Sequence, residues 1–310
     1  MTEIQKTKVY FRNTFVPFEE ATLSIASAPV LYGLSIYTVI PVFWTEKTKK
    51  LVMFRLKDHF KRLQNSSLVM AFDDFLQEWD YLKFEKTIKQ LLEKNSITMD
   101  SLVRVSVFVD DNLKGTRMHG LKHSLSAFVY PMTPILPESG AKLMVSSWRR
   151  TPDNAQPARA KINGSYVNAA LMKHEALMNG FDDAIALDEQ GHVTESTVAN
   201  IFLVRNGHLV TPGNSADLLE GITRDSIFRF ANHIKVSHEQ RTIDRSELYL
   251  ADEIFLCGSS MSIVPVIEVD HRKIGKGSIG PLTKRLQLLY QECTHQRSSD
   301  FDDWLTPVAL

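Results

Sequence analysis

The stretch ARAKINGSYVNAAL (residues 158–171) sets a lysine, Lys161, among small and apolar residues. Burial strips water from a charged amine, so surroundings of this kind lower the pKa of a lysine. A neutral lysine is a nucleophile toward aldehydes and forms Schiff bases with them. Lys161 is therefore either an exception to the usual separation of charged and apolar residues or a reactive amine. Other segments of the chain help to decide between these two interpretations.

The composition is that of an ordinary globular protein, and it excludes several function classes. The 310 residues include 36 basic and 36 acidic side chains, so no net charge attracts nucleic acid or an anionic membrane. The two cysteines, Cys257 and Cys293, have neither metal-site nor disulfide spacing. No apolar run approaches the ~20 residues of a membrane span, and the start has no apolar signal segment. We expect a cytoplasmic protein without metal, membrane or nucleic-acid partners.

The order of the elements predicts a mixed fold, α+β or α/β, in two domains. Helices are predicted where apolar residues recur at helical spacing, over 58–70, 81–95, 167–179, 221–234 and 281–290. Strands are predicted over 51–56, 102–109, 142–147, 184–187, 201–204 and 253–256, with a hairpin over 8–16 that turns near Arg12 and Asn13. The polar tail, 294–303, is expected to be loose.

Three prolines and a glycine in PMTPILPESG (131–140) are typical of an interdomain linker. We therefore expect a smaller amino-terminal domain over 1–130 and a larger domain over 141–310.

Pyridoxal phosphate is the aldehyde cofactor that makes most use of a reactive lysine, and it also needs a phosphate cradle and an acid facing its pyridine nitrogen. One candidate cradle is LEGITRDSIF (219–228), where a glycine and a threonine precede a helix whose free N–H groups favour an anion. Another is CGSSMS (257–262), directly after a strand. Taken alone, the first is more typical of a capped helix and the second of a plain turn.

A carboxylate and an arginine complete the set of candidates. Glu195, in HVTESTVANIFLV, could hold the pyridinium proton, although most glutamates lie on surface loops. Arg55, in FRLKDHFKRL, could bind a phosphate through two parallel hydrogen bonds, although a surface ion pair is an equally ordinary role.

The order of these segments resembles the fold-type IV (class IV) pyridoxal-phosphate aminotransferases, the family of the branched-chain and D-amino-acid transaminases. The resemblance is closest to the branched-chain enzymes and covers nearly all of the second half. The matching segments are FRLKDHFKRLQNS (54–66), SSWRRTPDNAQPARAKINGSYVNAAL (146–171), DDAIALDEQGHVTESTVANIFLV (182–204), LLEGITRDSI (218–227), RSELYLADEIFLCGSSMSIVPV (245–266) and GPLTKRLQLLY (280–290).

The resemblance implies a role for each matched residue. Lys161 would be the catalytic Schiff-base lysine, Tyr166 would bind the ring's phenolic oxygen, and Glu195 would pair with the ring nitrogen. The phosphate would be held by Arg55, Ile222, Thr223 and Ser259, with Gly221 giving the chain room beside it. The backbone amides of Ser260 and Met261 would face the substrate carboxylate. The family also implies a small α/β domain, a larger domain with a pseudo-barrel sheet, and a homodimer.

The chain departs from the branched-chain pattern on the substrate side. In LYGLSIYTVIPVFW (31–44) the pair Tyr32-Gly33 is retained, but Tyr37 stands in place of a phenylalanine and Thr38 in place of a glutamate. The segment 129–136 also differs. Tyr37 would still give an aromatic wall, and Arg104 matches an arginine near the branched-chain substrate site. A core aromatic and a strand-edge arginine are the plainer interpretations of these two residues.

We therefore expect transfer of an amino group from a branched-chain or other hydrophobic amino acid to 2-oxoglutarate through a Lys161 Schiff base. Three alternatives stay open: a D-amino-acid or amine transaminase, a lyase of the aminodeoxychorismate type, and a protein that binds the cofactor without turnover. A lyase would work without a second oxo acid, and a non-catalytic binder would show no response to any amine donor.

Overall fold

The computed structural model describes residues 7–46 and 48–308, and these form two compact units. Unit 1 consists of Met1–Thr133, Ala160–Gly164 and Glu292–Leu310, and unit 2 of Pro134–Arg159 and Ser165–Gln291. Unit 1 thus takes in two segments from later in the chain, one of which carries Lys161. The change from unit 1 to unit 2 after Thr133 falls within the proline-rich stretch 131–140.

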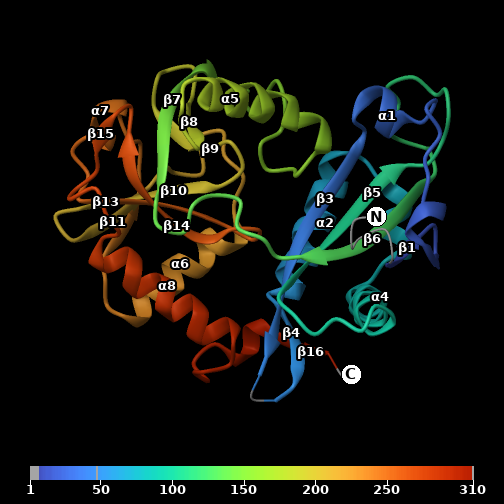
Figure 1. The fold of residues 1–310 in the computed structure, drawn as a ribbon. Coiled ribbons are helices and arrows are strands. Elements are labelled where there is room, and N and C mark those ends of the chain that lie inside the picture. The colour runs from blue at the N-terminus through green and yellow to red at the C-terminus, as the bar shows by residue number, and fades with distance from the viewer. Residues whose placement is uncertain (1–6, 47, 309–310) are drawn as a thin grey trace. The chain divides into compact units, whose positions relative to one another are not determined.

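Unit 1 is built on a seven-stranded sheet in which every neighbouring pair of strands is antiparallel. The order across the sheet is β16-β4-β3-β5-β6-β1-β2. The strands are β1 (Lys8–Phe11), β2 (Thr14–Pro17), β3 (Ser35–Thr45), β4 (Lys50–Phe54), β5 (Ser101–Val109), β6 (His123–Pro131) and β16 (Leu305–Val308). Figure 1 shows the last strand, β16, lying beside β4.

The longer helices of unit 1 cover one face of this sheet. The helices are α1 (Ala28–Tyr32), α2 (Leu56–Val69), α3 (Asp73–Glu78) and α4 (Tyr81–Lys94), with 3-10 turns at Phe18–Glu20 and Asp302–Trp304. Side chains alternate between the faces of a strand. In β5, Val103, Val105 and Val107 therefore join α2 and α4 in the core, while Arg104 and Ser106 lie on the opposite face.

Unit 2 contains a nine-stranded mixed sheet. Its strand order is β12-β11-β10-β13-β14-β7-β8-β9, with β15 paired to β14, and the pairs β14–β7, β7–β8 and β11–β12 are parallel. The strands are β7 (Ala141–Arg149), β8 (Asp183–Leu187), β9 (Val193–Ser196), β10 (Asn200–Arg205), β11 (His208–Thr211), β12 (His238–Gln240), β13 (Glu253–Gly258), β14 (Ser262–Val269) and β15 (Arg272–Lys273).

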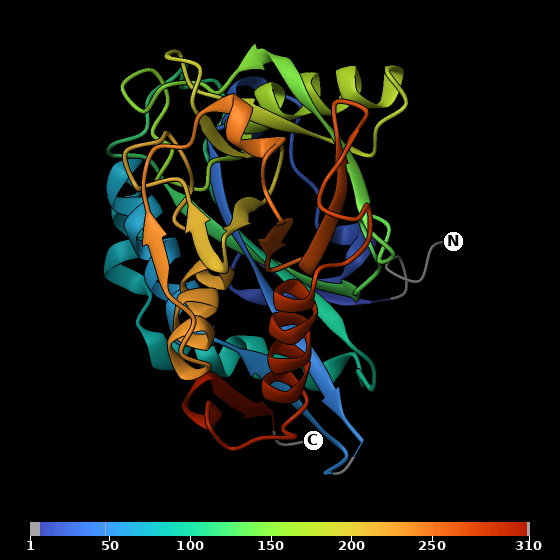
Figure 2. The same cartoon turned by 90° about the vertical axis from the view of Figure 1, so that its left-hand side faces the viewer.

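The helices of the second half pack on this sheet. They are α5 (Tyr166–Met178), α6 (Ile222–His233), α7 (Arg245–Leu248) and α8 (Pro281–Thr294), and a 3-10 turn at Asn163–Ser165 precedes α5. Figure 2 shows α8 beside α6, where the rings of Tyr290 and Phe230 meet edge to face with their centroids 6.5 Å apart. The buried Glu253 carboxylate accepts hydrogen bonds from the main chain of Leu282 and Thr283, which satisfies the start of α8.

The five predicted helices and the predicted strands are confirmed, with ends shifted by at most a few residues. The hairpin turns at Arg12 and Asn13, which both have positive φ as a two-residue hairpin loop requires. The expectation of a loose tail over 294–303 is wrong at both ends of that segment. Thr294 is the buried last residue of α8, and a turn at 302–304 leads into β16.

Within residues 7–46 and 48–308, no helix is both long enough and apolar enough to cross a membrane.

Candidate functional site

The main chain of Lys161 is fixed on both sides within unit 1. Its N–H donates to Ser66 Oγ on α2 at 3.1 Å, and its C=O accepts from the N–H of Tyr37 on β3 at 2.9 Å. The next residue, Ile162, forms an isolated β-bridge with Ile36. The lysine therefore has a defined position between a helix and a strand, as a side chain used in chemistry requires.

A close approach of two glycines holds the segment that follows Lys161. Gly33 ends α1 with φ of 68°, a conformation that glycine adopts without strain. A Cβ built on Gly33 would lie 2.8 Å from the Cα of Gly164, so a larger residue would push the two segments apart.

Tyr37 and Arg104 lie together beside Lys161. The Arg104 guanidinium carbon is 3.7 Å from the centre of the Tyr37 ring, and Lys161 Nζ is 4.8 Å from the same centre. Arg104 also donates to Asn163 Oδ1 at 2.6 Å, and Asn163 donates to Ser35 Oγ at 2.7 Å. Two of the four predicted substrate residues, Tyr37 and Arg104, therefore lie in the same unit as the predicted lysine, whereas Ser260 and Met261 belong to unit 2.

Tyr130 belongs to the same group of side chains, although the sequence did not single it out. Its phenol has a raised pKa because it is buried, and Arg104 and Tyr37 both act on it, with the cation opposing the shift. The alternation of β6, which places every second residue of 123–131 on one face, is the pattern that could have identified it.

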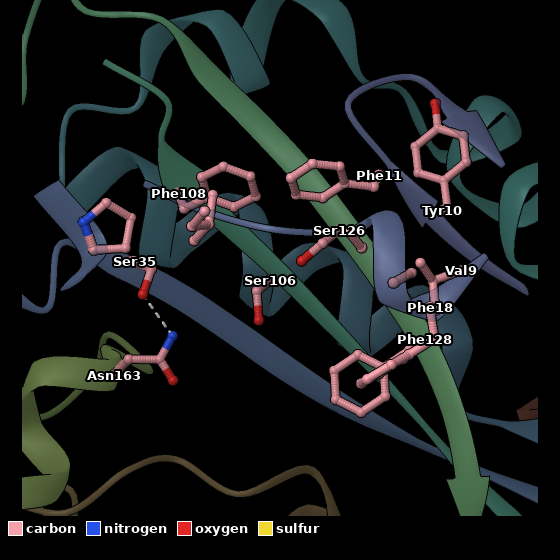
Figure 3. A pocket seen from close by; sticks show the side chains of 14 residues that line it. Val9, Tyr10, Phe11, Phe18, Ser35, Ser106, Phe108, Ser126, Phe128 and Asn163 are labelled. Atoms are coloured by element: carbon pink, nitrogen blue, oxygen red, sulfur yellow. Dashed lines mark hydrogen bonds between the residues drawn. The ribbon is translucent and has the colours of Figure 1, made fainter. Parts of the chain in front are cut away.

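A cavity of about 310 Å³ opens on this face of the unit 1 sheet (Figure 3). Aromatic side chains, including Phe11, Phe108 and Phe128, form its walls. The hydroxyls of three serines line it, namely Ser35, Ser106 and Ser126. Asn163 stands at its edge with its amide directed at Ser35, which connects the cavity to the position of Arg104.

Arg55, the predicted phosphate residue of unit 1, has a buried side chain and a strained main chain. Its φ is 52°, in the left-handed region that few residues other than glycine adopt, at the position just before α2. Its Nε donates to Asp58 Oδ2 at 2.7 Å, and its guanidinium stacks over the Trp304 ring at 4.9 Å. Its N–H also donates to the carbonyl of Trp304, so the returning C-terminal segment helps to fix the arginine.

Glu195 is a buried carboxylate of β9 in unit 2, with 5% of its surface exposed. Its Oε1 lies 2.8 Å from Arg150 Nη2, and its Oε2 accepts from Asn200 Nδ2 at 3.1 Å. A buried carboxylate with a cation on one oxygen and a donor on the other is stabilised in its ionised form. The predicted acid is therefore a fixed anion rather than a surface glutamate.

Asn200 connects this carboxylate to the start of α6. The same Nδ2 that bonds Glu195 also donates to the carbonyl of Leu219 at 2.9 Å. A Cβ built on Gly221 would lie only 2.0 Å from Asn200 Oδ1, so a side chain at this position would displace the amide. The Asn200 amide thus occupies the place of a side chain at Gly221, which only glycine permits.

The first turn of α6 is the candidate anion cradle. Gly221, its N-cap, has no side chain to accept a bond from that turn, and Ile222 and Thr223 are buried there. The next residue, Arg224, donates a hydrogen bond from Nη2 to the carbonyl of Pro212 at 2.7 Å. N–H groups and the positive end of a twelve-residue helix favour a phosphate at such a position.

The remaining predicted residues of unit 2 lie at two element boundaries. Ser259 and Ser260 are half-buried in the turn between β13 and β14, where the N–H of Met261 donates to the carbonyl of Gly258 at 3.2 Å. Tyr166 is the half-buried first residue of α5. No group of three or more metal-binding side chains occurs among the residues that the structure describes.

The structure also shows side chains that the sequence did not predict and that hold the predicted ones. In unit 1, Ser66 binds the main chain of Lys161 and Asn163 binds Arg104. In unit 2, Arg150 and Asn200 bind the carboxylate of Glu195. Ser66, Asn163 and Arg150 act through contacts between segments separated in the chain, for which a single sequence gives no signal, whereas Asn200 is only five residues from Glu195.

Comparison with known proteins gives one consistent answer. The family described as "Amino-transferase class IV" matches residues 37–269. The chain is 38% identical to the probable branched-chain-amino-acid aminotransferase of Aquifex aeolicus (strain VF5), over 96% of each chain.

Two solved structures extend the match to the fold. The branched-chain aminotransferase of Thermoproteus uzoniensis with norvaline gives a TM-score of 0.93 at 30% identity, covering 98% of this chain and 99% of that one. The branched-chain amino acid aminotransferase of Thermobaculum terrenum in its PLP-form gives 0.92 at 28% identity, covering 99% and 100%. With its two sheets and the helices packed on them, this chain is a fold-type IV enzyme and belongs to the class IV aminotransferase family.

Proposed function

We propose that the protein is a pyridoxal-phosphate-dependent aminotransferase that moves the amino group of a branched-chain or similar hydrophobic amino acid to 2-oxoglutarate. The observation that carries the proposal is the position of Lys161, whose N–H and C=O are both bonded and whose amine lies over the ring of Tyr37, on which Arg104 also stacks. The names of the relatives, at up to 38% identity among those reported above, support the same activity.

The residues of the chain fit this cofactor. Gly221 lets the Asn200 amide lie against the main chain directly before a helix start suited to a phosphate. Glu195 is a buried anion suited to a ring nitrogen that carries a proton. We assign the phosphate to Arg55, Ile222, Thr223 and Ser259, and the phenolic oxygen of the ring to the hydroxyl of Tyr166.

When bound, pyridoxal phosphate supplies an aldehyde that captures the amino group and a ring that takes up the electrons of the broken C–H bond. Lys161 acts as the general base, removing the α-proton of the amino acid and later returning it. Its main-chain bonds to Ser66 and Tyr37 fix the point from which the side chain extends. Glu195, which Arg150 and Asn200 hold in place, would accept the hydrogen bond of the protonated ring nitrogen.

The protein residues that bind the substrates must accommodate both an apolar side chain and the second carboxylate of 2-oxoglutarate. Tyr37 offers an aromatic wall, and the Arg104 guanidinium stacked on it offers a cation for a carboxylate. The backbone amide of Ser260 is assigned to the carboxylate that every substrate shares, and the N–H of Met261 would join it on release from the carbonyl of Gly258. Tyr130 adds a second aromatic side chain to the same group.

The first test is transamination between L-leucine or L-valine and 2-oxoglutarate, followed through the oxo acid formed. We expect Lys161→Ala to lose this activity by at least about 10³-fold, because Lys161 is the base assigned to the proton transfer. Lys57→Ala, at an exposed position of α2, is the control and is expected to keep wild-type rates. Near-wild-type activity of Lys161→Ala would refute the assignment.

The same assay separates the alternatives. Activity only with D-alanine or another amine would favour the D-amino-acid or amine transaminase. Turnover without any oxo acid would favour the lyase, and a cofactor that no donor changes would favour the non-catalytic binder.

We also propose a cytoplasmic homodimer. Two loops of unit 1 are joined by a bond from the N–H of Leu113 to the carbonyl of Ala26, and Ile25 and Leu113 expose 85% and 78% of their surface. Val30 and Leu31 of the adjacent helix α1 are also exposed, so apolar side chains gather here as at an interface. Light scattering is expected to give twice the chain mass of 35.2 kDa, and Ile25→Asp with Leu113→Asp to give a monomer. A wild-type monomer would contradict the proposal.

A further inference from the structure

The cavity on the unit 1 sheet is larger than a branched aliphatic side chain requires. Its volume is about 310 Å³, whereas an engineered apolar cavity of about 150 Å³ is enough to bind benzene. The described residues that line it carry no charge, so neither a carboxylate nor an amine of a ligand would meet a counter-ion there. The cavity therefore suits an uncharged, mainly apolar group of at least the size of an aromatic ring.

Two serines at the floor of the cavity give it this room. Ser106 of β5 and Ser126 of β6 are directly paired in the sheet, and both are half-buried. The rings of Phe11, Phe108 and Phe128 stand around the two hydroxyls (Figure 3). Because serine side chains are short, they leave a hollow between these rings that a larger residue at either position would fill.

The cavity adjoins the residues of unit 1 that are assigned to the substrate. Tyr37 of β3 is paired directly with Ser106, and Arg104 of β5 is paired directly with Phe128. Residues paired in this way point to the same face of a sheet, with their Cβ atoms only about 5 Å apart. Tyr37 and Arg104 therefore lie on the face that carries the cavity, each beside a residue that lines it. An amino acid bound next to them can extend its side chain into the cavity.

We propose that this cavity receives the substrate side chain and that the protein accepts aromatic amino acids such as L-phenylalanine as well as branched-chain ones. The inference rests on the proposed function, because that function brings an amino acid to Tyr37 and Arg104. The ring of the substrate lies among the phenylalanines of the cavity, where edge-to-face contacts between aromatic rings are favourable. Ser106 and Ser126 determine the specificity, since their small size sets the room available.

The test is the ratio of kcat/KM for L-phenylalanine to kcat/KM for L-leucine, each with 2-oxoglutarate as the acceptor. We expect the wild type to use both amino acids. Ser126→Leu is expected to lower the ratio at least about 10-fold, because its added carbons occupy the place of the substrate ring. Ser246→Leu, the same change at an exposed position of α7, is the control and is expected to keep the wild-type ratio.

Binding of two unreactive acids separates recognition from turnover. 3-Phenylpropanoate and 4-methylpentanoate have the carbon skeletons of L-phenylalanine and L-leucine without the amino group. In calorimetry on the cofactor-loaded protein, Ser126→Leu is expected to weaken binding of 3-phenylpropanoate at least about 10-fold more than binding of 4-methylpentanoate.

Three results would overturn the inference. One is a wild-type protein that uses L-leucine but not L-phenylalanine, which needs no variant to be seen. Another is an unchanged ratio in Ser126→Leu, including an equal loss for both amino acids, because the damage would then be general. The third is a different mass of Ser126→Leu in light scattering, which would assign the cavity to a subunit contact. A wild-type protein that transfers no amino group from any amino acid would instead refute the proposed function.

Discussion

At Lys161, Glu195 and Gly221 the reactive or ligand-facing group is held by residues that do no chemistry themselves. Ser66 and the main chain of Tyr37 fix the lysine, and Arg150 and Asn200 fix the glutamate. These bonds fix the groups before the substrate binds. Less conformational entropy is therefore lost on binding.

Gly221→Ala is expected to damage the protein through Asn200. The new Cβ would lie 2.0 Å from Asn200 Oδ1, so the amide must move and release both Glu195 and the carbonyl of Leu219. We expect the free energy of unfolding to fall by about 1–3 kcal/mol, the usual cost of overpacking. Denaturant unfolding and cofactor titration would measure both effects.

The control for this substitution is Gly213→Ala. A Cβ at Gly213 meets nothing closer than Ser215 Oγ at 3.9 Å, so stability should stay within about 0.5 kcal/mol of the wild type. If the two variants behaved alike, the close fit between Gly221 and Asn200 would have no functional consequence.

Arg104→Met is expected to separate the two substrates of the reaction. Loss of the guanidinium removes the cation proposed for the second carboxylate of 2-oxoglutarate but keeps an apolar side chain beside Tyr37. The kcat/KM for 2-oxoglutarate should fall by about 10-fold or more, as for a lost charge-assisted bond, while the half-reaction with L-leucine changes little. Equal losses for both substrates would assign Arg104 a structural role.

Single residues are predictable from sequence where a local motif carries their chemistry, as for Lys161 and the glycine before α6. Arg150 and Asn200 are not, because their role exists only through contacts with Glu195 that the fold creates.

Among the elements, α4 begins at a side-chain cap that can be tested directly. Asp80 accepts a hydrogen bond from the N–H of Lys83 at 2.7 Å, satisfying one of the first free donors of the helix. Asp80→Ala should lower the free energy of unfolding by about 1 kcal/mol, and Asp80→Ser should retain most of it. Urea unfolding would show both; an alanine variant as stable as the wild type would mean that the cap contributes nothing.

The helices were predictable because their apolar residues repeat at helical spacing, as Phe84, Ile88 and Leu91 do in α4. Strand β3 was not predictable from a sequence pattern, because nearly all of its residues are buried and it contains Pro41. Proline is tolerated there since pairing with β4 begins at Val42, so Pro41 lies beyond the end of that ladder. β16 follows a polar segment and depends on pairing with β4, from a distant part of the chain.

Across the whole molecule, the two cysteines report on global unfolding. Burial raises the pKa of Cys257 and of Cys293 to about 12, from an ordinary value of 9.0. At pH 8 only about one in 10⁴ of each thiol is ionised in the folded protein, so alkylation should be very slow. In urea both thiols should react rapidly.

The raised thiol pKa values also give stability a pH dependence. Between about pH 9 and 12 the unfolded thiols ionise while the folded ones keep their protons, so stability falls as the pH rises through this range. Rapid alkylation of the folded protein at pH 8 would show that the cores around the two cysteines open locally.

The central claim is that Lys161 holds the cofactor, and one measurement addresses it directly. The protein is incubated with pyridoxal phosphate, reduced with borohydride so that the cofactor becomes permanently attached to its amine, and digested for peptide mass spectrometry. We predict the phosphopyridoxyl mass on Lys161 alone, and its loss when an amino-acid donor is added before the reduction. Modification of another lysine in place of Lys161, or of none, would contradict the account.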